Sequence, residues 1–220
     1  MSKDTSRIHY EILDKKRLEI LGKLAPLTAN FVLSGGTALS LQINHRKSYD
    51  FDFFANRAIS VNLLPDLQKI VPIDRVLVNN SDELSVMTTD NIKISFIYYP
   101  FLKKSELIEI QNGIKILPIS VIASQKAYTI GRRGTYRDYF DIYSILKGEC
   151  LSLAEIIKVA QEIYGNEIFN PKLFLEQLVY FDDLTNFEII PVESSKVLPG
   201  SDEVKLYLQE EVKKVLKDWE

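Results

Sequence analysis

The spacing of apolar residues separates a first half, in which short apolar runs alternate with turn signals, from a second half that is helical. Residues 5–22 carry apolar side chains mostly at helical spacing, which predicts a first helix. Residues 31–33 form a short apolar run that stops just before Gly35 and Gly36, and residues 37–43 then return to helical spacing. The pattern therefore predicts a strand that passes through the glycine pair into a helix.

An alternating pattern follows in residues 49–55, which read YDFDFFA. Because successive side chains of a strand point to opposite faces, Asp50 and Asp52 fall on one face of the predicted strand. Phe51 and Phe53 fall on the other face. A short helix within residues 59–71 is expected next, and further strands are predicted at residues 73–79, 83–89, 92–99 and 113–118.

Helical spacing dominates from Ser120 onward, and Ser120 is the N-cap expected for the first of these helices. The sequence GRRGT, residues 131–135, is expected to form a loop, and Ser152 with Glu155 forms the capping box of a later helix. Helices are predicted at residues 120–130, 136–147, 152–164 and 201–219, and a further one opens at residues 170–171.

These elements together predict an α+β fold in two domains, a mixed α/β domain of residues 1–118 and a helical domain of residues 119–220. The composition, 46% hydrophobic and 26% charged, is typical of a soluble globular protein. The net charge of −3 gives no overall basic character, so nucleic acid would have to be bound through a local basic patch. A charged N-terminus, no long apolar stretch and a single cysteine, Cys150, lead us to expect a cytoplasmic protein without a signal peptide or membrane span.

The glycine pair and the aspartate pair carry the candidate chemistry. Glycines between a strand and a helix let the backbone approach an anion closely, and the helix N-terminus supplies N–H donors, which is typical of a phosphate site. Asp50 and Asp52 offer hard oxygen ligands of the kind that hold Mg²⁺ together with substrate phosphates. The alternatives are a simple turn and a solvated strand edge. Aspartate is depleted in strands, and its place here among aromatic residues argues against a solvated face.

A second group of charged residues lies in the helical half. Asp138 and Asp141 are three positions apart and share one face of a predicted helix, with Lys126 on the helix before it. A purely structural reading, in which Asp138 caps its helix or forms an ion pair with a nearby cation, remains open. Further cations suited to phosphate, or to a solvated surface, are Arg46, Arg132, Arg133 and Arg137.

Residues 35–54, GGTALSLQINHRKSYDFDFF, resemble the signature of the AbiEii/AbiGii-type nucleotidyltransferases. These are toxin components of bacterial abortive-infection (toxin–antitoxin) systems within the polymerase-β-like nucleotidyltransferase superfamily. The family also has a later lysine, an arginine-containing loop and an Asp-x-x-Asp helix, which Lys126 and the sequence GRRGTYRDYFDIY of residues 131–143 match. The resemblance covers roughly residues 31–146, and residues 150–220 carry no matching motif.

The resemblance implies a nucleotidyltransferase fold, a mixed β-sheet flanked by helices, followed by a helical domain. It implies Mg²⁺- or Mn²⁺-dependent transfer of a nucleotidyl group from an NTP to an acceptor hydroxyl, with RNA or tRNA as the expected acceptor and a cognate antitoxin as the expected partner. The catalytic residues it implies are Asp50, Asp52, Lys126, Asp138 and Asp141, of which Asp50 and Asp52 hold the metal. The phosphate-binding residues it implies are Gly35, Gly36, Thr37, Arg46, Arg132, Arg133 and Arg137.

One position departs from the superfamily pattern. Members often carry a third carboxylate on a strand that follows the Asp-x-Asp strand, and the corresponding position here is Ser95. Three readings follow: Asp138 or Asp141 completes the metal site, a single metal is bound, or the protein binds NTP or RNA without turnover. The last is the alternative function, a binding module with the nucleotidyltransferase fold.

Overall fold

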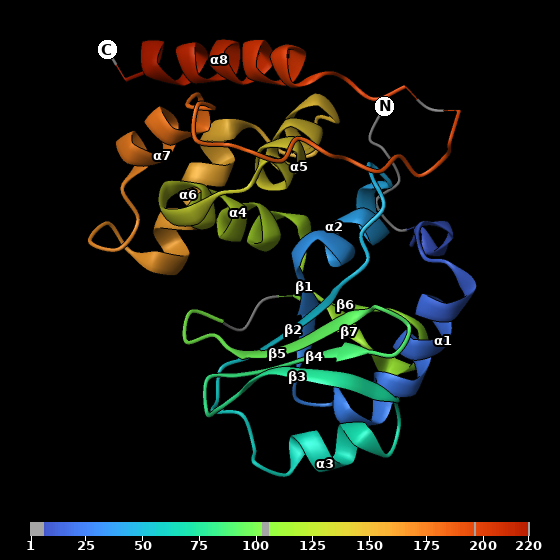
Figure 1. Ribbon diagram of the computed structural model, residues 1–220. Helices are drawn as coiled ribbons and strands as arrows, with labels where there is room; N and C mark the ends of the chain where they lie inside the picture. Colours follow the sequence, from blue (N-terminus) through green and yellow to red (C-terminus); the bar gives the residue numbers. More distant parts are fainter. Residues whose placement is uncertain (1–6, 103–105, 196, 220) are drawn as a thin grey trace. The chain divides into compact units, whose positions relative to one another are not determined.

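The computed structural model describes residues 7–102, 106–195 and 197–219 and divides into two compact units, Met1–Pro118 and Ile119–Glu220 (Figure 1). The helices of the first unit, with three 3₁₀-helices among them, are η1 (Tyr10–Ile12), α1 (Lys15–Leu24), η2 (Ala25–Leu27), α2 (Gly35–Ile43), α3 (Leu63–Gln68) and η3 (Gln111–Gly113). Its strands are β1 (Val32–Ser34), β2 (Phe51–Ala55), β3 (Ile73–Asn79), β4 (Glu83–Thr88), β5 (Lys93–Tyr98), β6 (Ile108–Glu109) and β7 (Lys115–Ile116).

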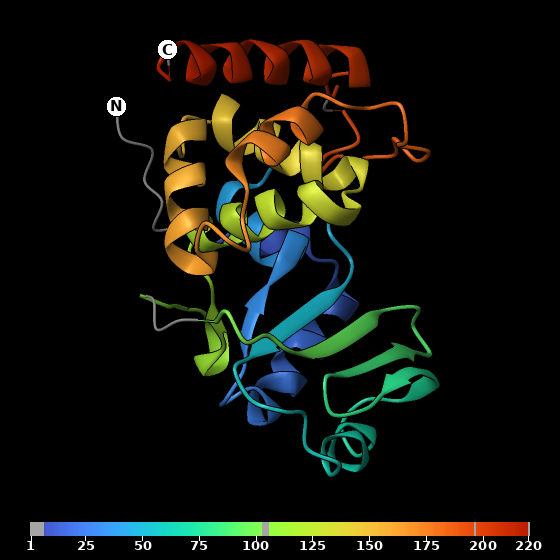
Figure 2. The same cartoon turned by 90° about the vertical axis from the view of Figure 1, so that its left-hand side faces the viewer.

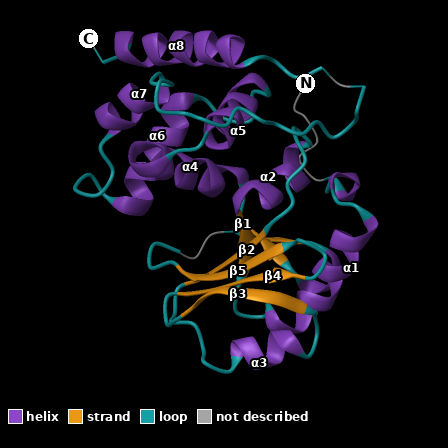
Figure 3. Cartoon of the chain, in the orientation of Figure 1, coloured by secondary structure: helices purple, strands orange, loops and turns teal. Residues whose placement is uncertain are grey.

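The strands form one seven-stranded mixed sheet in the order β3-β4-β5-β2-β1-β7-β6 (Figure 3). Strand β2 lies in its middle, antiparallel to β1 and parallel to β5. The three-strand meander predicted between residues 73 and 99 is confirmed as β3, β4 and β5. The predicted α+β class, a mixed sheet flanked by helices, is confirmed as well.

The alternation predicted for β2 is confirmed by the burial of its side chains. Phe51 and Phe53 are fully buried, whereas Asp52 and Phe54 are half-buried on the opposite face. The ring of Phe53 stacks on Phe96 of β5 with centroids 5.3 Å apart. Figure 2 looks onto the sheet with α1 behind it. The aromatic core therefore fixes which face of β2 carries the carboxylate.

The first helix is shorter than the sequence pattern predicts. Helix α1 begins at Lys15 because Asp14 is its N-cap, with extended backbone angles and a carboxylate that accepts a hydrogen bond from Arg17 N at 2.8 Å. The segment before it is held differently, since His9 N donates to Leu41 O at 2.8 Å. The first residues of the predicted helix, 5 and 6, lie outside the described residues.

The second unit is helical in the part that the structure describes. Its helices are α4 (Ile119–Arg133), α5 (Tyr136–Lys147), α6 (Leu153–Tyr164), α7 (Pro171–Leu178) and α8 (Ser201–Lys217). No helix among the described residues is long and apolar enough to cross a membrane. Fully buried alanines, Ala123 and Ala127 on α4 and Ala160 on α6, let these two helices pack closely along their lengths.

Helix α4 differs from its predicted bounds at both ends. It begins at Ile119, directly after Pro118, so Ser120 is a helical residue and not the N-cap. It continues through Arg133, so the predicted five-residue loop is reduced to Gly134 and Thr135. The capping box of Ser152 and Glu155 at the start of α6 is confirmed.

We expect the protein to lose stability at alkaline pH through two buried tyrosines of α5. Burial raises the pKa of Tyr136 and of Tyr139 to about 12, and the charges of Asp183 and Asp138 add to the rise at Tyr139. Because the folded state favours the neutral phenols, their stabilisation is complete below the ordinary pKa of about 10 and is lost as the pH rises toward 12. Each tyrosine then removes about 2 kcal/mol from the free energy of unfolding.

Urea unfolding between pH 8 and 12 measures this loss. Tyr139→Phe should flatten the pH dependence, at a cost of about 1 kcal/mol for the hydrogen bond that its hydroxyl donates to Gln177 O at 3.1 Å. Tyr180→Phe, at an exposed position, is the matched control. An alkaline slope that is the same in wild type and Tyr139→Phe would contradict the prediction.

Candidate functional site

The turn from β1 into α2 brings a carboxylate against the start of a helix. Gly35 is the first residue of α2 and has a positive φ of 66°, which disfavours other residues. A Cβ added at Gly35 would lie 2.8 Å from Asp52 Oδ2. Strand pairing produces this approach, because Ser34 and Asp52 are opposite one another in the β1–β2 ladder. A glycine is therefore required here both by the backbone and by the position of Asp52.

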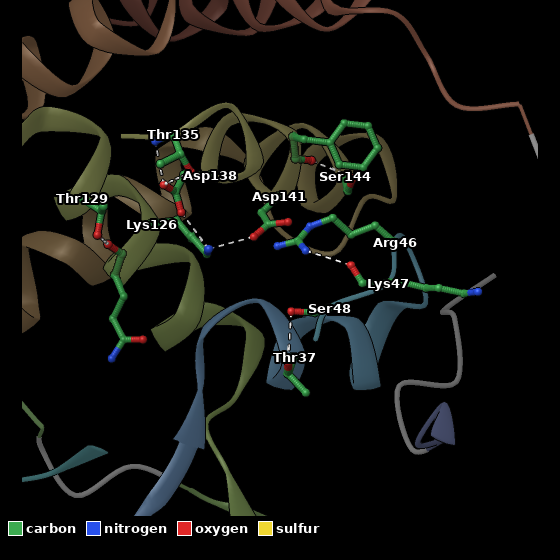
Figure 4. Close-up of polar contacts among 12 residues, drawn as sticks. Thr37, Arg46, Lys47, Ser48, Lys126, Thr129, Thr135, Asp138, Asp141 and Ser144 are labelled. Atoms are coloured by element: carbon green, nitrogen blue, oxygen red, sulfur yellow. Dashed lines mark hydrogen bonds and ion pairs between the residues drawn. The ribbon is translucent and has the colours of Figure 1, made fainter. Parts of the chain in front are cut away.

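The second glycine makes room for a cation. A Cβ at Gly36 would lie 2.5 Å from Arg46 Nη2 and 3.0 Å from Ser48 Oγ. Arg46 is 4% exposed, and its Nη1 donates to Lys47 O at 3.1 Å (Figure 4). The first turn of α2 thus lies against one carboxylate and one guanidinium. The sequence pattern located Arg46 but gave no sign of Ser48.

Thr37, in the same turn, anchors the segment that leads into β2. Its hydroxyl donates to the carbonyl oxygen of Asp50. Ser48 Oγ lies 3.0 Å from the same hydroxyl oxygen, Thr37 Oγ1 (Figure 4). The side chain is 1% exposed. The hydroxyl of Thr37 therefore positions Asp50, and the residue can reach an anion through its backbone N–H.

The start of α2 offers donors for an anion. The first N–H groups of a helix have no intrahelical acceptor, and the side chain of the N-cap residue, Ser34, does not accept from them. Asp52 and Arg46 occupy the space that a Cβ of Gly35 or Gly36 would take, so an anion would have to reach this turn through its N–H groups.

The donor set around Asp52 fits a hard divalent cation. Asp50 immediately precedes β2, and Asp52 lies within it, flanked in the ladders by the hydroxyl-bearing Ser34 and Ser95. No group of three or more metal-ligating side chains occurs among the described residues. Two carboxylates with the remaining ligands taken from phosphates and water is the usual arrangement for Mg²⁺ in phosphoryl-transfer sites.

The row of the sheet that contains Asp52 is polar across four strands, β1, β2, β5 and β4. Ser95 is in register with Asp52, fully buried, and its hydroxyl lies 2.9 Å from Ser85 Oγ on β4. Ser85 Oγ donates to Glu83 Oε1 at 2.5 Å. The position at which the superfamily often has a third carboxylate therefore holds a hydroxyl, and an acidic group, Glu83, is linked to it two strands away from Asp52. The alternation of Glu83 and Ser85 was the sequence signal for this row.

Lys126 lies between the two aspartates of α5. Its Nζ is 2.8 Å from Asp138 Oδ1 and 2.8 Å from Asp141 Oδ2 (Figure 4). Asp141 is fully buried. Asp138 also completes the capping box of α5, since its Oδ2 accepts from Thr135 N at 2.9 Å. The structural reading of Asp138, a cap that also forms an ion pair, is thus observed, whereas Asp141 lies beyond the cap.

The three arginines near α5 differ in their surroundings. Arg132 lies over the ring of Tyr128 at 3.6 Å and donates to Tyr128 O and Ile168 O at 3.1 and 2.7 Å. Its guanidinium therefore joins α4 to the segment before α7. Arg137 is exposed on α5, and the side chain of Arg133, the last residue of α4, lies outside the described residues.

The candidate residues thus form two clusters, one in each unit. In the first unit the Asp52 carboxylate, the Arg46 guanidinium and the backbone of Asp50 lie against the turn of Gly35, Gly36 and Thr37. In the second unit Lys126 binds Asp138 and Asp141.

We expect Gly35→Ala to destabilise the protein more than a matched substitution elsewhere. Both Gly35 and Gly113 have positive φ, so alanine costs about 1–2 kcal/mol at either position. An alanine at Gly113 meets no atom within 4 Å, whereas one at Gly35 collides with the Asp52 carboxylate. Urea unfolding of the two variants measures the difference. Equal losses at Gly35 and Gly113 would show that Asp52 does not press on the turn.

Comparison with known proteins identifies a family and several proteins that resemble this chain. Residues 19–75 match the family model "Nucleotidyl transferase AbiEii toxin, Type IV TA system". An uncharacterized protein of Aquifex aeolicus is 31% identical over 212 residues, which covers 94% of this chain and 98% of that protein. A crystal structure titled as a putative nucleotidyltransferase from H. pylori has a TM-score of 0.56 at 22% identity and covers 94% of this chain and 99% of its own.

A further structure shares the fold. The nucleotidyltransferase toxin MenT4 from Mycobacterium tuberculosis has a TM-score of 0.56 at 14% identity, over 89% of this chain and 80% of its own. The resemblance that the glycine and aspartate motifs predicted is confirmed. The chain belongs to the AbiEii family of nucleotidyl transferase toxins of type IV toxin–antitoxin systems, and it is a nucleotidyltransferase.

Proposed function

We propose that the protein transfers a nucleotidyl group from an NTP to an acceptor hydroxyl at a site built on Asp50 and Asp52. The single observation that carries this proposal is the contact of the Asp52 carboxylate with Gly35 at the start of α2. It joins oxygen ligands suited to a divalent metal to backbone donors suited to phosphate. Bound Mg²⁺ or Mn²⁺ would neutralise triphosphate charge and activate the attacking oxygen.

The triphosphate would be held by the first turn of α2. Its N–H groups and the positive end of its dipole attract an anion. Arg46, whose guanidinium lies against Gly36, adds a fixed positive charge at this turn. Thr37 holds Asp50 in place through its hydrogen bond to the Asp50 carbonyl. During transfer the acceptor hydroxyl gives up its proton to water, and its oxygen bonds to the α-phosphorus. The bond from that phosphorus to the oxygen bridging to the β-phosphate breaks, and pyrophosphate leaves.

Lys126 is the cation that we propose for the triphosphate from the second unit. Its ion pairs with Asp138 and Asp141 fix the position of its ammonium group. Both carboxylate oxygens of Asp138 are engaged, one by Lys126 and the other by Thr135. This supports Asp138 as a positioning residue, and Asp141 is the aspartate that we propose to act with Lys126 near the nucleotide. The engaged guanidinium of Arg132 supports a structural role, so Arg137 is the better candidate of the two for contact with phosphate.

RNA, and tRNA in particular, is the acceptor that we propose, with a cognate antitoxin as partner and growth inhibition as the result. The description of the family as type IV toxins supports the partner. The decisive experiment is incubation with each labelled NTP, Mg²⁺ or Mn²⁺, and total RNA. Label in RNA is the expected result. Label in no acceptor under any of these conditions would favour an NTP- or RNA-binding role instead, which Ser95 in register with Asp52 would explain.

We expect Asp52→Asn to abolish transfer while the fold remains intact. Asparagine keeps the size of the side chain but removes the charge that holds the metal, so the loss should exceed the roughly 100-fold typical of an outer-shell partner. Without metal the stability should change little, because relief of the repulsion between Asp50 and Asp52 offsets the lost attraction of Asp52 to the N-terminus of α2. Labelled-NTP transfer and thermal unfolding measure the two effects.

Asp66→Asn is the matched control, since Asp66 lies in the same unit with a half-exposed side chain in a surface ion pair. It should change neither activity nor stability appreciably. An Asp52→Asn protein that unfolds, or that retains transfer, would contradict the metal-binding role.

We expect Lys126→Ala to weaken NTP binding and to destabilise the second unit. Removal of the lysine leaves Asp138 and the buried Asp141 without their shared cation, at a cost of about 3 kcal/mol. Lys126→Ala with Asp141→Asn removes one of the two charges and should recover part of the stability but no transfer activity. NTP affinity and urea unfolding separate the two losses. Recovery of transfer in the double variant would show that Lys126 acts only in folding.

A further inference from the structure

Three aromatic rings form a cluster that begins on the face of β2 that carries Asp52. Phe54 follows Asp52 by two positions and shares its half-buried face of β2. The ring of Phe54 stacks on Tyr99 with centroids 5.1 Å apart and an interplanar angle of 27°. Tyr99 in turn meets the edge of Phe101 at 5.6 Å and 74°. All three rings are half-buried, so each keeps part of its surface accessible.

Backbone pairing fixes the position of this cluster relative to Asp52. Tyr99 N donates to Ala55 O at 2.7 Å, which ties the residue after β5 to the end of β2. Two strand residues span about 7 Å, so the Phe54 ring starts about that far from the Asp52 carboxylate. This separation is comparable to the span from phosphate to base within one nucleotide.

The cluster lies on the far side of Asp52 from the proposed phosphate site. Asp52 is opposite Ser34, the residue that leads into Gly35, whereas Phe54 is opposite Val32 at the other end of β1. Along β2 the order is therefore the α2 turn, then Asp52, then Phe54. An in-line displacement has the attacking and leaving oxygens on opposite sides of the phosphorus. With pyrophosphate at the α2 turn, the attacking oxygen comes from the direction of Phe54.

We propose that Phe54, Tyr99 and Phe101 form a stacking platform for an unpaired nucleobase of the acceptor strand. The inference rests on the proposed function, since it assumes transfer at Asp50 and Asp52. Aromatic rings bind the π-face of any base, so the platform selects a single-stranded nucleic acid with little regard to sequence. Its place next to the carboxylates matches the terminal nucleotide, whose hydroxyl must reach the reacting phosphorus.

A fluorescence assay tests the platform without any need for turnover. The chain has one tryptophan, Trp219, so Phe54→Trp in a Trp219→Phe background places a single reporter ring in the platform. The probes are a mixed-sequence single-stranded RNA oligonucleotide and the same oligonucleotide with an abasic 3′-terminal nucleotide, both added without NTP. We expect quenching by the intact oligonucleotide and an affinity for the abasic one that is lower by about ten-fold or more.

A second variant separates stacking from folding. Tyr99→Leu keeps apolar volume but removes the ring, so it should bind the intact oligonucleotide as weakly as the reporter protein binds the abasic one. Its affinity for the abasic oligonucleotide should equal that of the reporter protein for the same oligonucleotide. Tyr99→Phe keeps the ring and should bind like the reporter protein, and Tyr180→Leu, an exposed tyrosine of the second unit, is the control for loss of an aromatic surface.

The outcomes decide between the platform and its alternatives. Equal affinity for intact and abasic oligonucleotides, or no binding of either, would overturn the proposal. Quenching by NTP that competes with the oligonucleotide would assign the rings to the base of the incoming nucleotide and would overturn it as well. Because both probes are added without NTP, a difference in affinity between them would support the platform even where labelled-NTP transfer fails, so the two failures remain distinguishable.

Discussion

The contact between the Asp52 carboxylate and the first residue of α2 is the constraint on which the first unit's site depends. It requires a positive φ and no side chain at Gly35. It also requires β1 and β2 to pair so that Ser34 is opposite Asp52. The connection from α2 to β2 must also bring the Asp50 carbonyl within reach of the Thr37 hydroxyl, which donates a hydrogen bond to it. The negative charge is placed at the positive end of a helix, an arrangement that is electrostatically favourable in itself.

The second unit holds its charges by a different principle. Lys126 forms ion pairs with both Asp138 and Asp141, and the three side chains are largely buried. Buried carboxylates are costly unless paired and hydrogen-bonded, and the ammonium group of Lys126 pairs with both of these carboxylates. The capping of α5 by Asp138 lets the same side chain contribute to helix stability and to the position of the lysine.

Much of the fold could be predicted from the sequence because short-range signals decided it. Alternation predicted β2, turn residues predicted the meander, and a capping box predicted the start of α6. The errors arose where a tertiary contact prevailed. The segment before α1 is held by the hydrogen bond from His9 to Leu41, and β6 is two residues long and lies at the edge of the described sheet, where it pairs with β7.

The candidate site likewise combines features that can be predicted from the sequence with features that depend on tertiary contacts. The pairing of Ser95 with Asp52 could be anticipated by counting along two strands, and the structure has this register. The close approaches of Arg46 and Ser48 to Gly36 could not be anticipated, because they depend on how the segment after α2 folds back over its first turn. The structural role of Arg132 could not be anticipated either, because it depends on a hydrogen bond to the carbonyl of Ile168, a residue far along the chain.

The core and the site are coupled through the period of a single strand. Phe51 and Phe53 pack on the buried face of β2, so Asp52 and Phe54 must point to the other. A shift of one residue in register would carry Asp52 into the core and the core phenylalanines onto the accessible face. The cost of that exchange, an unpaired buried charge together with two exposed rings, keeps the register fixed. The aromatic core of the sheet, more than any contact among the polar residues, therefore determines that Asp52 meets the glycine turn.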